Sequence, residues 1–516
     1  MTKNAKIMII SNISVEAFFN TSLDNETQEC SFEYIFESLN FENEIKNDED
    51  IDLIICFLNF ETLYPNAVND IVRDATSYKE KIKSIQYKCS EFYFKLKKEF
   101  SKPIFWIGFE DFFLYNYYPM FGLAQLLGSD IDYLNIKIKD FLCNGEDQYL
   151  DFKGIIASVG IYNAFNCKYK CLWNMPYSTI LINKLKETIS QAYLSLCGKS
   201  KKCIVIDCDN VLWGGILSEI GTEKICLSNN GMGKYYYDFQ RFLLTLYYNG
   251  IILAVCSKNE YNDVLAVFRE HTDMLLKEDN IACFKVNWDN KVDNIIWISS
   301  CLNISLDSMV FVDDSDFEIQ SVKMLIPEVH TIKFTNDYNM YKCFGCLYLK
   351  SGNVLDEVLK RHQTYKTNDQ RELLLLRSSS FDEFLKSLEL VIDIHKTHSI
   401  ELNRIAELSQ RTNKCTNGKR YFINQLLELK SVPSYSLYTV SAKDRFSDLG
   451  IVGAIGIENN KLDLFCLSCR ALGRGIEEKM LLFVNNYATD YCFSLTDKNV
   501  DLFNKLREQF GAIENH

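Results

Sequence analysis

The sequence predicts a mixed α/β protein of three domains, and three observations support this prediction. Short apolar runs that read as buried strands alternate with amphipathic helical stretches, which is typical of layered α/β domains. With 516 residues, the chain is too long for a single hydrophobic core. Polar stretches near residues 198–202 and 347–378 supply the boundaries. We therefore predict domains at residues 1–198, 199–346 and 347–516.

Composition places the chain among ordinary globular proteins, with 47% hydrophobic and 24% charged residues. No apolar run reaches the roughly 18 residues of a membrane span, and the start leads into a short strand rather than a secretory leader. Nineteen cysteines without a disulfide framework predict a reducing, cytoplasmic location. The formal charge of −13 argues against nucleic-acid or anionic-membrane partners. The two Cys-x-x-Cys pairs, at Cys343/Cys346 and Cys466/Cys469, lie too far apart in sequence to favour zinc over simple packing.

The first domain reads as a layer of strands and helices. Strands are expected at residues 6–11, 50–58 and 102–107, with a long helix over 78–100. All six histidines lie at or beyond His271, so a Ser-His catalytic pair cannot be built here. We expect this domain to position a substrate or partner; a purely structural role is the alternative.

The central domain is organised around an apolar run, residues 203–206, that ends abruptly on Asp207 and Asp209. A strand buried on both faces reads as such a run, and ligands collect beyond the carboxyl ends of parallel strands. Two carboxylates this close resist joint ionisation unless a cation lies between them, which predicts Mg2+ as their companion. Taken alone, such a pair more often marks a strand followed by an Asp-Asn turn.

Two further apolar runs, at residues 250–256 and 308–312, end on polar side chains in the same way. A lysine stands between these runs, just ahead of a helical stretch at residues 293–302. Along the chain there is first a strand that ends on acids, then a strand that ends on a hydroxyl, then a lysine, and last another strand that ends on acids. A simple turn does not explain this order. The residues in these positions are Ser257, Lys291, Asp313 and Asp314.

This order resembles the motif series of haloacid-dehalogenase-type phosphoryl and acyl-phosphate enzymes. The resemblance implies that Asp207 attacks phosphorus and that Asp209 protonates the leaving oxygen and then activates water. Ser257 and Lys291 would hold the phosphoryl oxygens whose charge builds during transfer. Val211 stands where the motif usually has Thr. The implied Mg2+ ligands are Asp207, Asp209, Asp313 and Asp314.

The stretch from Asp207 to Cys256 must hold a flap and a helix, so a large cap domain does not fit. An uncapped site is open to solvent, and this suits a substrate carried on another macromolecule better than a small free metabolite.

A closer resemblance is to the FkbH-like proteins, through Leu212-Trp-Gly-Gly215 and the flap Ser218-Glu-Ile-Gly221. The family more often has an acid where Ile220 stands. Its amino-terminal domain is loosely esterase-like (SGNH-like), and residues 10–17 and 56–61 resemble it.

The last domain is expected to be α+β. Helices are predicted at residues 381–388, 400–410 and 476–487, and strands at 390–395, 435–442, 450–457 and 462–469. The last strand runs into Arg470-Ala-Leu-Gly473-Arg474-Gly475 and then a helix, an order that resembles the pyrophosphate-cradling loop of GNAT acyltransferases. The implied cofactor-binding residues are Arg470, Gly473, Arg474 and Gly475; the alternative is a strand-helix turn without a ligand.

The best-known FkbH-like enzymes load a glyceryl unit from 1,3-bisphosphoglycerate onto the phosphopantetheine thiol of an acyl carrier protein. The resemblance therefore implies a Mg2+-dependent acyltransferase and phosphatase of polyketide-type biosynthesis, with a phosphorylated donor and an acyl carrier protein as partners. The alternative enzyme is a phosphatase acting on another carrier-bound or small-molecule phosphate. A non-catalytic scaffold is disfavoured because every motif residue is present.

Two expectations concern the acyl intermediate and the carrier. Cys208 and Cys256 adjoin the motif residues, but strand alternation points both thiols into the core, which makes them unreactive.

A carrier protein is generally acidic, so a local basic surface would attract it. The candidates are Arg404, Arg411, Lys414, Lys419 and Arg420, with Arg470 and Arg474; a solvated loop without a partner is the alternative.

Overall fold

The computed structural model describes residues 5–20, 32–38, 51–100, 102–110, 121–142, 147–197, 200–347, 362–365, 367, 383, 386–496 and 498–510. The chain divides into two compact units, Met1–Tyr193 and Leu194–His516. Two parallel sheets and one antiparallel sheet confirm a mixed α/β protein. The second unit holds two of these sheets, and the three-domain division stays a prediction. Among the described residues, no helix has the length and apolar character needed to cross a membrane.

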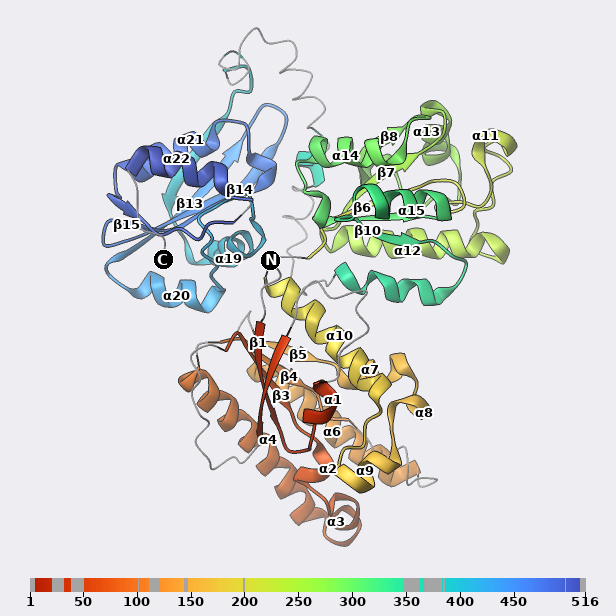
Figure 1. Ribbon diagram of the computed structural model, residues 1–516, viewed down its shortest axis with the longest axis vertical. Coiled ribbons are helices and arrows are strands. Elements are labelled where there is room, and N and C mark those ends of the chain that lie inside the picture. The colour runs from red at the N-terminus through yellow and green to blue at the C-terminus, as the bar shows by residue number, and fades with distance from the viewer. Residues whose placement is uncertain are drawn as a thin grey trace. The chain divides into compact units, whose positions relative to one another are not determined.

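The first unit is built on a parallel sheet in the order β2-β1-β3-β4-β5, drawn in red and orange in Figure 1. The long helix α4 (Ala75–Glu99) forms because buried residues recur every three or four positions and because Asp74 caps its first turn through Ser77 N. This helix and α6 (Phe121–Phe141) pack on one face of the sheet. The strands are β1 (Ala5–Ser11), β2 (Phe32–Ser38), β3 (Leu53–Phe57), β4 (Ile104–Ile107) and β5 (Gln148–Leu150). The other helices are α1 (Glu16–Phe19), α2 (Phe60–Leu63), α3 (Ala67–Arg73), α7 (Phe152–Val159), α8 (Ile161–Ala164), α9 (Cys167–Trp173) and α10 (Thr179–Leu196).

The second unit begins with a parallel sheet, here called the central sheet, in the order β10-β9-β6-β7-β8. Its strands are β6 (Cys203–Ile206), β7 (Ile252–Ser257), β8 (Ile281–Val286), β9 (Met309–Asp313) and β10 (His330–Lys333). Every residue of β6, β7 and β9 is buried, which explains why these strands read as continuous apolar runs.

Helices cover both faces of the central sheet, because alternate side chains of each strand point to opposite faces. One face packs against α12 (Lys234–Tyr248) and α13 (Tyr261–Glu270), and the other against α14 (Lys291–Leu302) and α15 (Asp316–Leu325). The short elements are α11 (Leu217–Ile220), η1 (Gly231–Gly233), η2 (Glu278–Asn280), η3 (Leu306–Ser308) and η4 (Tyr338–Leu347).

The connection from β6 to β7, which the structure describes in full, holds only α11, η1 and α12 among its helices. An isolated bridge between Gly214 and Cys226 closes the flap on itself. This connection leaves the carboxyl edge of the central sheet without a separate cap domain.

The strand order of the central sheet reverses at β6. The chain passes from β6 to β7 and β8 on one side of β6 and then returns to β9 on the other side. Such a reversal opens a crevice beyond the carboxyl ends of the two strands that flank it. The fold therefore places the residues that follow β6 and β9 at the expected ligand-binding edge.

The rest of the second unit is built on an antiparallel sheet, here called the carboxy-terminal sheet, in the order β11-β13-β14-β15-β12 with β16 beside β15. The predicted pairing of residues 435–442 with 450–457 is present as β13 and β14. The helix predicted at 381–388 and the connector at 347–378 fall largely outside the described residues. The strands are β11 (Val391–Lys396), β12 (Cys415–Thr416), β13 (Tyr435–Lys443), β14 (Asp448–Glu458), β15 (Lys461–Leu467) and β16 (Asp490–Tyr491).

The carboxy-terminal sheet also has helices on both faces. Helices α19 (Leu402–Arg411) and α20 (Ile423–Ser431) pack on one face, and α21 (Ile476–Asn485) and α22 (Val500–Phe510) on the other. Two short turns, η5 (Ser399–Glu401) and η6 (Cys469–Ala471), complete the described part.

Candidate metal and phosphoryl site

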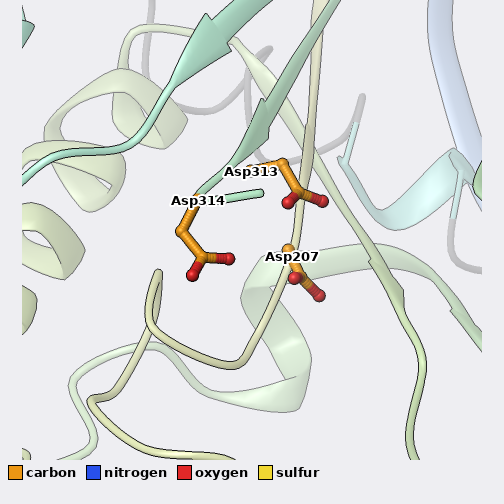
Figure 2. Close-up of side chains that lie close together, drawn as sticks. All are labelled: Asp207, Asp313 and Asp314. Carbon is orange, nitrogen blue, oxygen red and sulfur yellow. The ribbon is translucent and has the colours of Figure 1, made fainter. Parts of the chain in front are cut away.

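Three carboxylates meet at the carboxyl edge of the central sheet, where β6 and β9 end side by side (Figure 2). Asp207 directly follows β6, Asp313 is the last residue of β9, and Asp314 follows it. The amide of Asp207 donates a hydrogen bond to the carbonyl of Val312 at 3.0 Å, which fixes the first acid beside the other two. One oxygen from each carboxylate lies within 4.8 Å of the others. Residues far apart in sequence thus form one acidic cluster.

Lys291 bridges two of these acids. It is the first residue of α14, which the side chain of Asn290 caps. Its Nζ lies 2.8 Å from Asp207 Oδ2 and 2.6 Å from Asp313 Oδ2, and the residue is 3% exposed. Burial alone would lower the pKa of Lys291, but the charges of Asp207 and Asp313 outweigh it and raise that pKa. The lysine is therefore a fixed cation at the centre of the site.

One lysine does not balance three acids. Burial and the charge of Asp207 raise the pKa of Asp313 to about 6 and also raise the pKa of Asp314. Asp207 Oδ1 is buried and has no hydrogen-bond partner among the described residues. A buried carboxylate oxygen is costly unless it meets a donor or a cation. An all-oxygen set with such an atom fits Mg2+, with Asp207, Asp313 and Asp314 as the residues that would hold it.

Asp209 lies outside this group of three. Its Oδ1 accepts hydrogen bonds from Trp213 Nε1 at 3.0 Å and Leu217 N at 3.2 Å, and its Oδ2 accepts from Asn259 Nδ2 at 3.0 Å. Burial raises the pKa of Asp209 despite these donors. A carboxyl group with a raised pKa, held in a fixed orientation, suits proton transfer. The implied role of Asp209 as a metal ligand stays a prediction.

Ser257 ends β7 on the same edge and is 1% exposed. Asn259 joins Ser257 to Asp209, because the Nδ2 of Asn259 also donates to Ser257 Oγ at 3.2 Å.

Asn210 is, after Asn259, a second asparagine that the sequence analysis did not single out. It adopts a left-handed φ of 55° and accepts a hydrogen bond from Gly215 N, and hydrogen bonding by its side chain opposes the rise in the pKa of Asp314. Asn210 and Asn259 both stand in the segments that directly follow β6 and β7. This position was the sequence signal that could have identified them as site residues.

The two thiols beside the site are fully buried, as strand alternation predicts for Cys208 and Cys256. Burial raises the pKa of Cys208 well above its usual value, and burial raises that of Cys256 to about 12.

We expect iodoacetamide to leave Cys208 and Cys256 unmodified in the native protein while it alkylates the exposed Cys167 and Cys171. Peptide mass spectrometry measures this difference. Rapid native-state labelling of Cys208 would contradict this inert environment.

The glycine loop after β15 turns its arginines inward. Arg470 is 2% exposed and donates from Nη2 to the carbonyl of Leu449 at 2.8 Å, and Arg474 Nη1 lies 3.7 Å from Asp444 Oδ2. Gly473 and Gly475 have positive φ values of 73° and 75°, which glycine adopts without strain.

The amide of Gly473 donates to Glu477 Oε1 at 3.0 Å. A carboxylate of the same segment therefore takes the position in which a phosphate would accept this hydrogen bond. The binding role implied for Arg470, Gly473, Arg474 and Gly475 stays a prediction.

The basic residues at 404–420 are largely engaged within the fold. Glu407 pairs with both Arg404 and Arg411. Arg420 donates to the carbonyls of Ser409 and Gln410. The remaining two lysines contact Asn303 and Asp463, from Lys414 and Lys419 respectively.

The first unit also gathers polar residues at the carboxyl edge of its sheet. Asn59 follows β3, and its Nδ2 donates at 3.1 Å to Glu110 Oε1 and to the Tyr177 hydroxyl. Tyr177 in turn donates to Glu110 Oε1 at 2.9 Å. Ser11 ends β1 at the same edge and is buried. No histidine occurs before His271, so these groups do not form a Ser-His pair.

Comparison with known proteins places the fold among solved structures. The N-terminal part of the protein BF1531 from Bacteroides fragilis, which contains a phosphatase domain and was solved with Mg, matches with a TM-score of 0.52 and 21% identity. The match covers 67% of this chain and 94% of that one. It shows a shared fold.

Two weaker matches have TM-scores of 0.22 and 0.17, and no argument rests on them. They are an uncharacterized protein from Corynebacterium glutamicum, at 10% identity over 30% of this chain and 100% of that one, and a fungal multi-domain β-N-acetylglucosaminidase with a GCN5-related N-acetyltransferase region, at 9% identity over 90% of this chain and 54% of that one. No family model matches the sequence, and no curated protein matches it.

Proposed function

We propose that this protein is a Mg2+-dependent phosphoryl-transfer enzyme of the haloacid-dehalogenase type that hydrolyses a phosphate ester or acyl phosphate. The observation that carries the proposal is the cluster of Asp207, Asp313 and Asp314 around the buried Lys291. The shared fold with a Mg-complexed phosphatase-containing protein supports it. Bound Mg2+ would supply positive charge to the phosphoryl oxygens during transfer.

In the proposed reaction, side chains of this protein make the bond to phosphorus and transfer the protons. A carboxylate oxygen of Asp207 attacks phosphorus, the bond from phosphorus to the leaving oxygen breaks, and Asp209 gives that oxygen a proton. Asp209 then takes a proton from water, whose oxygen attacks the aspartyl phosphate and releases inorganic phosphate. The proposed role of Lys291 and Ser257 is to hold the charge that develops on the phosphoryl oxygens, and the ion pair between Lys291 and Asp207 supports it.

We further propose that the substrate is 1,3-bisphosphoglycerate and that the glyceryl unit is passed to the thiol of an acyl carrier protein. The resemblance to FkbH-like proteins supports this donor, and the short β6–β7 connection supports a substrate attached to a macromolecule. The sulfur of the thiol attacks the acyl carbon, the bond from that carbon to the phosphate oxygen breaks, and the phosphate leaves with the thiol proton. Hydrolysis of the 3-phosphate completes the transfer. The carboxy-terminal part of the second unit is the proposed carrier-binding region.

Intact-mass analysis of the carrier tests this substrate assignment. With Mg2+, 1,3-bisphosphoglycerate and holo carrier protein, we expect the carrier to gain the mass of one glyceryl group. The matched control uses apo carrier protein, which lacks the phosphopantetheine thiol and should gain no mass.

Two other outcomes are informative. Phosphate release without a change in carrier mass would favour the second candidate, a phosphatase acting on another carrier-bound or small-molecule phosphate. Absence of phosphate release from every phosphorylated donor tried would contradict the hydrolytic assignment itself.

A further inference from the structure

A second polar pocket lies within the second unit, at the edge of the central sheet opposite to the acidic cluster. Lys202 precedes β6, Ile252 begins β7, and the segment from Asn303 to Ser308 leads into β9, so these residues mark the amino ends of the three strands. The end of α19 and the η6 turn supply the opposite wall. The cavity has a volume of about 70 Å³.

Hydrogen bonds join the two walls of this pocket. Lys202 Nζ donates to the carbonyl of Arg411 at 2.9 Å, and Lys414 Nζ donates to Asn303 Oδ1 at 2.8 Å. Asn303 Nδ2 donates to the carbonyl of Cys469 at 2.8 Å. The pocket is therefore built by residues of both the central and the carboxy-terminal sheets.

Positive charge is concentrated in this pocket. Among the described residues that line the pocket, Glu407 is the only acid, and it pairs with two of the arginines. Asp307, just outside the lining, pairs with Lys498. Even with both acids counted, the cations are in excess in a chain whose formal net charge is −13. The cations that line the pocket are Lys202, Arg404, Arg411, Lys414, Arg470 and Lys498.

Lys202 shows the electrostatic effect of this arrangement. Burial, the largest cause, and the charges of Arg411 and Lys498 lower its pKa, Cys469 and Asp307 act in the opposite direction, and the net pKa is about 8. Arg404, Lys414 and Arg470 add positive charge from the other wall, and Glu407 supplies negative charge there. An anion in the pocket would relieve this repulsion.

We propose that the pocket binds a phosphate-type oxyanion, either free inorganic phosphate or the phosphoryl group of a small phosphomonoester. Guanidinium and ammonium groups from several directions match the tetrahedral oxygens of such a ligand. The cavity has room for a phosphoryl group. This site is separate from the acidic cluster, and its occupation does not depend on the proposed phosphoryl-transfer reaction.

Isothermal titration with sulfate tests the site, because sulfate does not titrate near neutral pH. The titration is done in EDTA, so that no metal at the acidic cluster can recruit the anion. Arg411→Gln and Lys498→Gln should each weaken binding by roughly tenfold, because each removes a charge-assisted contact. Lys505→Gln is the matched control: Lys505 and Lys498 are similarly exposed and each pairs with one carboxylate, but Lys505 lies outside the pocket.

Proton uptake gives a second readout. At pH 8 the wild-type protein should take up protons when sulfate binds, because the anion raises the pKa of Lys202 from about 8. Titrations in buffers of different ionisation enthalpy measure this uptake. Lys202→Met should abolish it, and if that variant fails to fold, the Arg411→Gln and Lys498→Gln titrations still decide the matter.

Further titrations with inorganic phosphate and glycerol phosphate distinguish the two ligand sources. Tighter binding of glycerol phosphate supports a small organic phosphomonoester, and tighter binding of inorganic phosphate supports the free ion. The proposal is overturned if sulfate and phosphate do not bind, or if they bind equally well to the wild type and both pocket variants.

Discussion

Asp207→Asn is expected to reduce phosphate release by at least about a thousandfold, because an amide cannot act as the attacking carboxylate. The side chain keeps its shape, so the β6–β9 edge should form as before. A colorimetric phosphate assay in saturating Mg2+ measures the loss, and circular dichroism checks the fold. The hydrogen bond from the Asp207 amide to the carbonyl of Val312 does not involve the side chain, so it should persist in the variant.

Asp316→Asn is the matched control for this variant. Asp316 begins α15 close to the acidic cluster in sequence, but its side chain is exposed and paired with Lys333. Its activity should stay within about twofold of the wild type, as is usual for surface positions away from the chemistry. Wild-type activity in Asp207→Asn, or equal losses in both variants, would contradict the assignment of Asp207.

Lys291→Met is expected to lower the Tm in EDTA by roughly 10 °C, because removal of one partner from a buried ionic group costs about 3–5 kcal/mol. The variant leaves Asp207 and Asp313 without the cation that they pair with. Mg2+ should then raise the Tm by more than it does in the wild type, because the metal no longer competes with the ammonium group. Differential scanning fluorimetry with and without Mg2+ measures both effects.

Lys333→Met provides the comparison for this change. Lys333 ends β10 in the same sheet, but its ion pair with Asp316 is exposed. Its Tm should stay within about 2 °C of the wild type, and its response to Mg2+ should be unchanged. A Lys291→Met protein that melts like the wild type in EDTA would show that the lysine does not hold the acids together.

The sequence was most informative where strands are buried on both faces. The runs that end on Asp207, Ser257 and Asp313 became β6, β7 and β9, and their parallel order brings these ends to one edge. The edge strand β8 was not predicted, since half-buried residues break up its apolar run.

Side-chain direction was the part that pattern alone did not predict. Arg470 and Arg474 stand in a loop rich in small residues, which reads as an exposed phosphate-binding turn, yet both are buried. Asn259 is likewise fixed by a contact to Asp209, which lies just beyond the neighbouring strand β6. Such contacts join residues far apart in sequence, so local propensity carries no record of them.

The insertion of β6 between β7 and β9 also sets the time at which the acidic cluster can form during synthesis. β6 and β7 emerge first and can pair, but Asp207 lacks both of its acidic neighbours until β9 has been made. The cluster forms late because β9 pairs with β6, a strand far back in the chain. Contacts between residues far apart in sequence form slowly during folding. A nascent chain that stops before Asp313 therefore has Asp207 and Lys291 but lacks the other two carboxylates, and the acidic cluster can form only after Asp314 has left the ribosome.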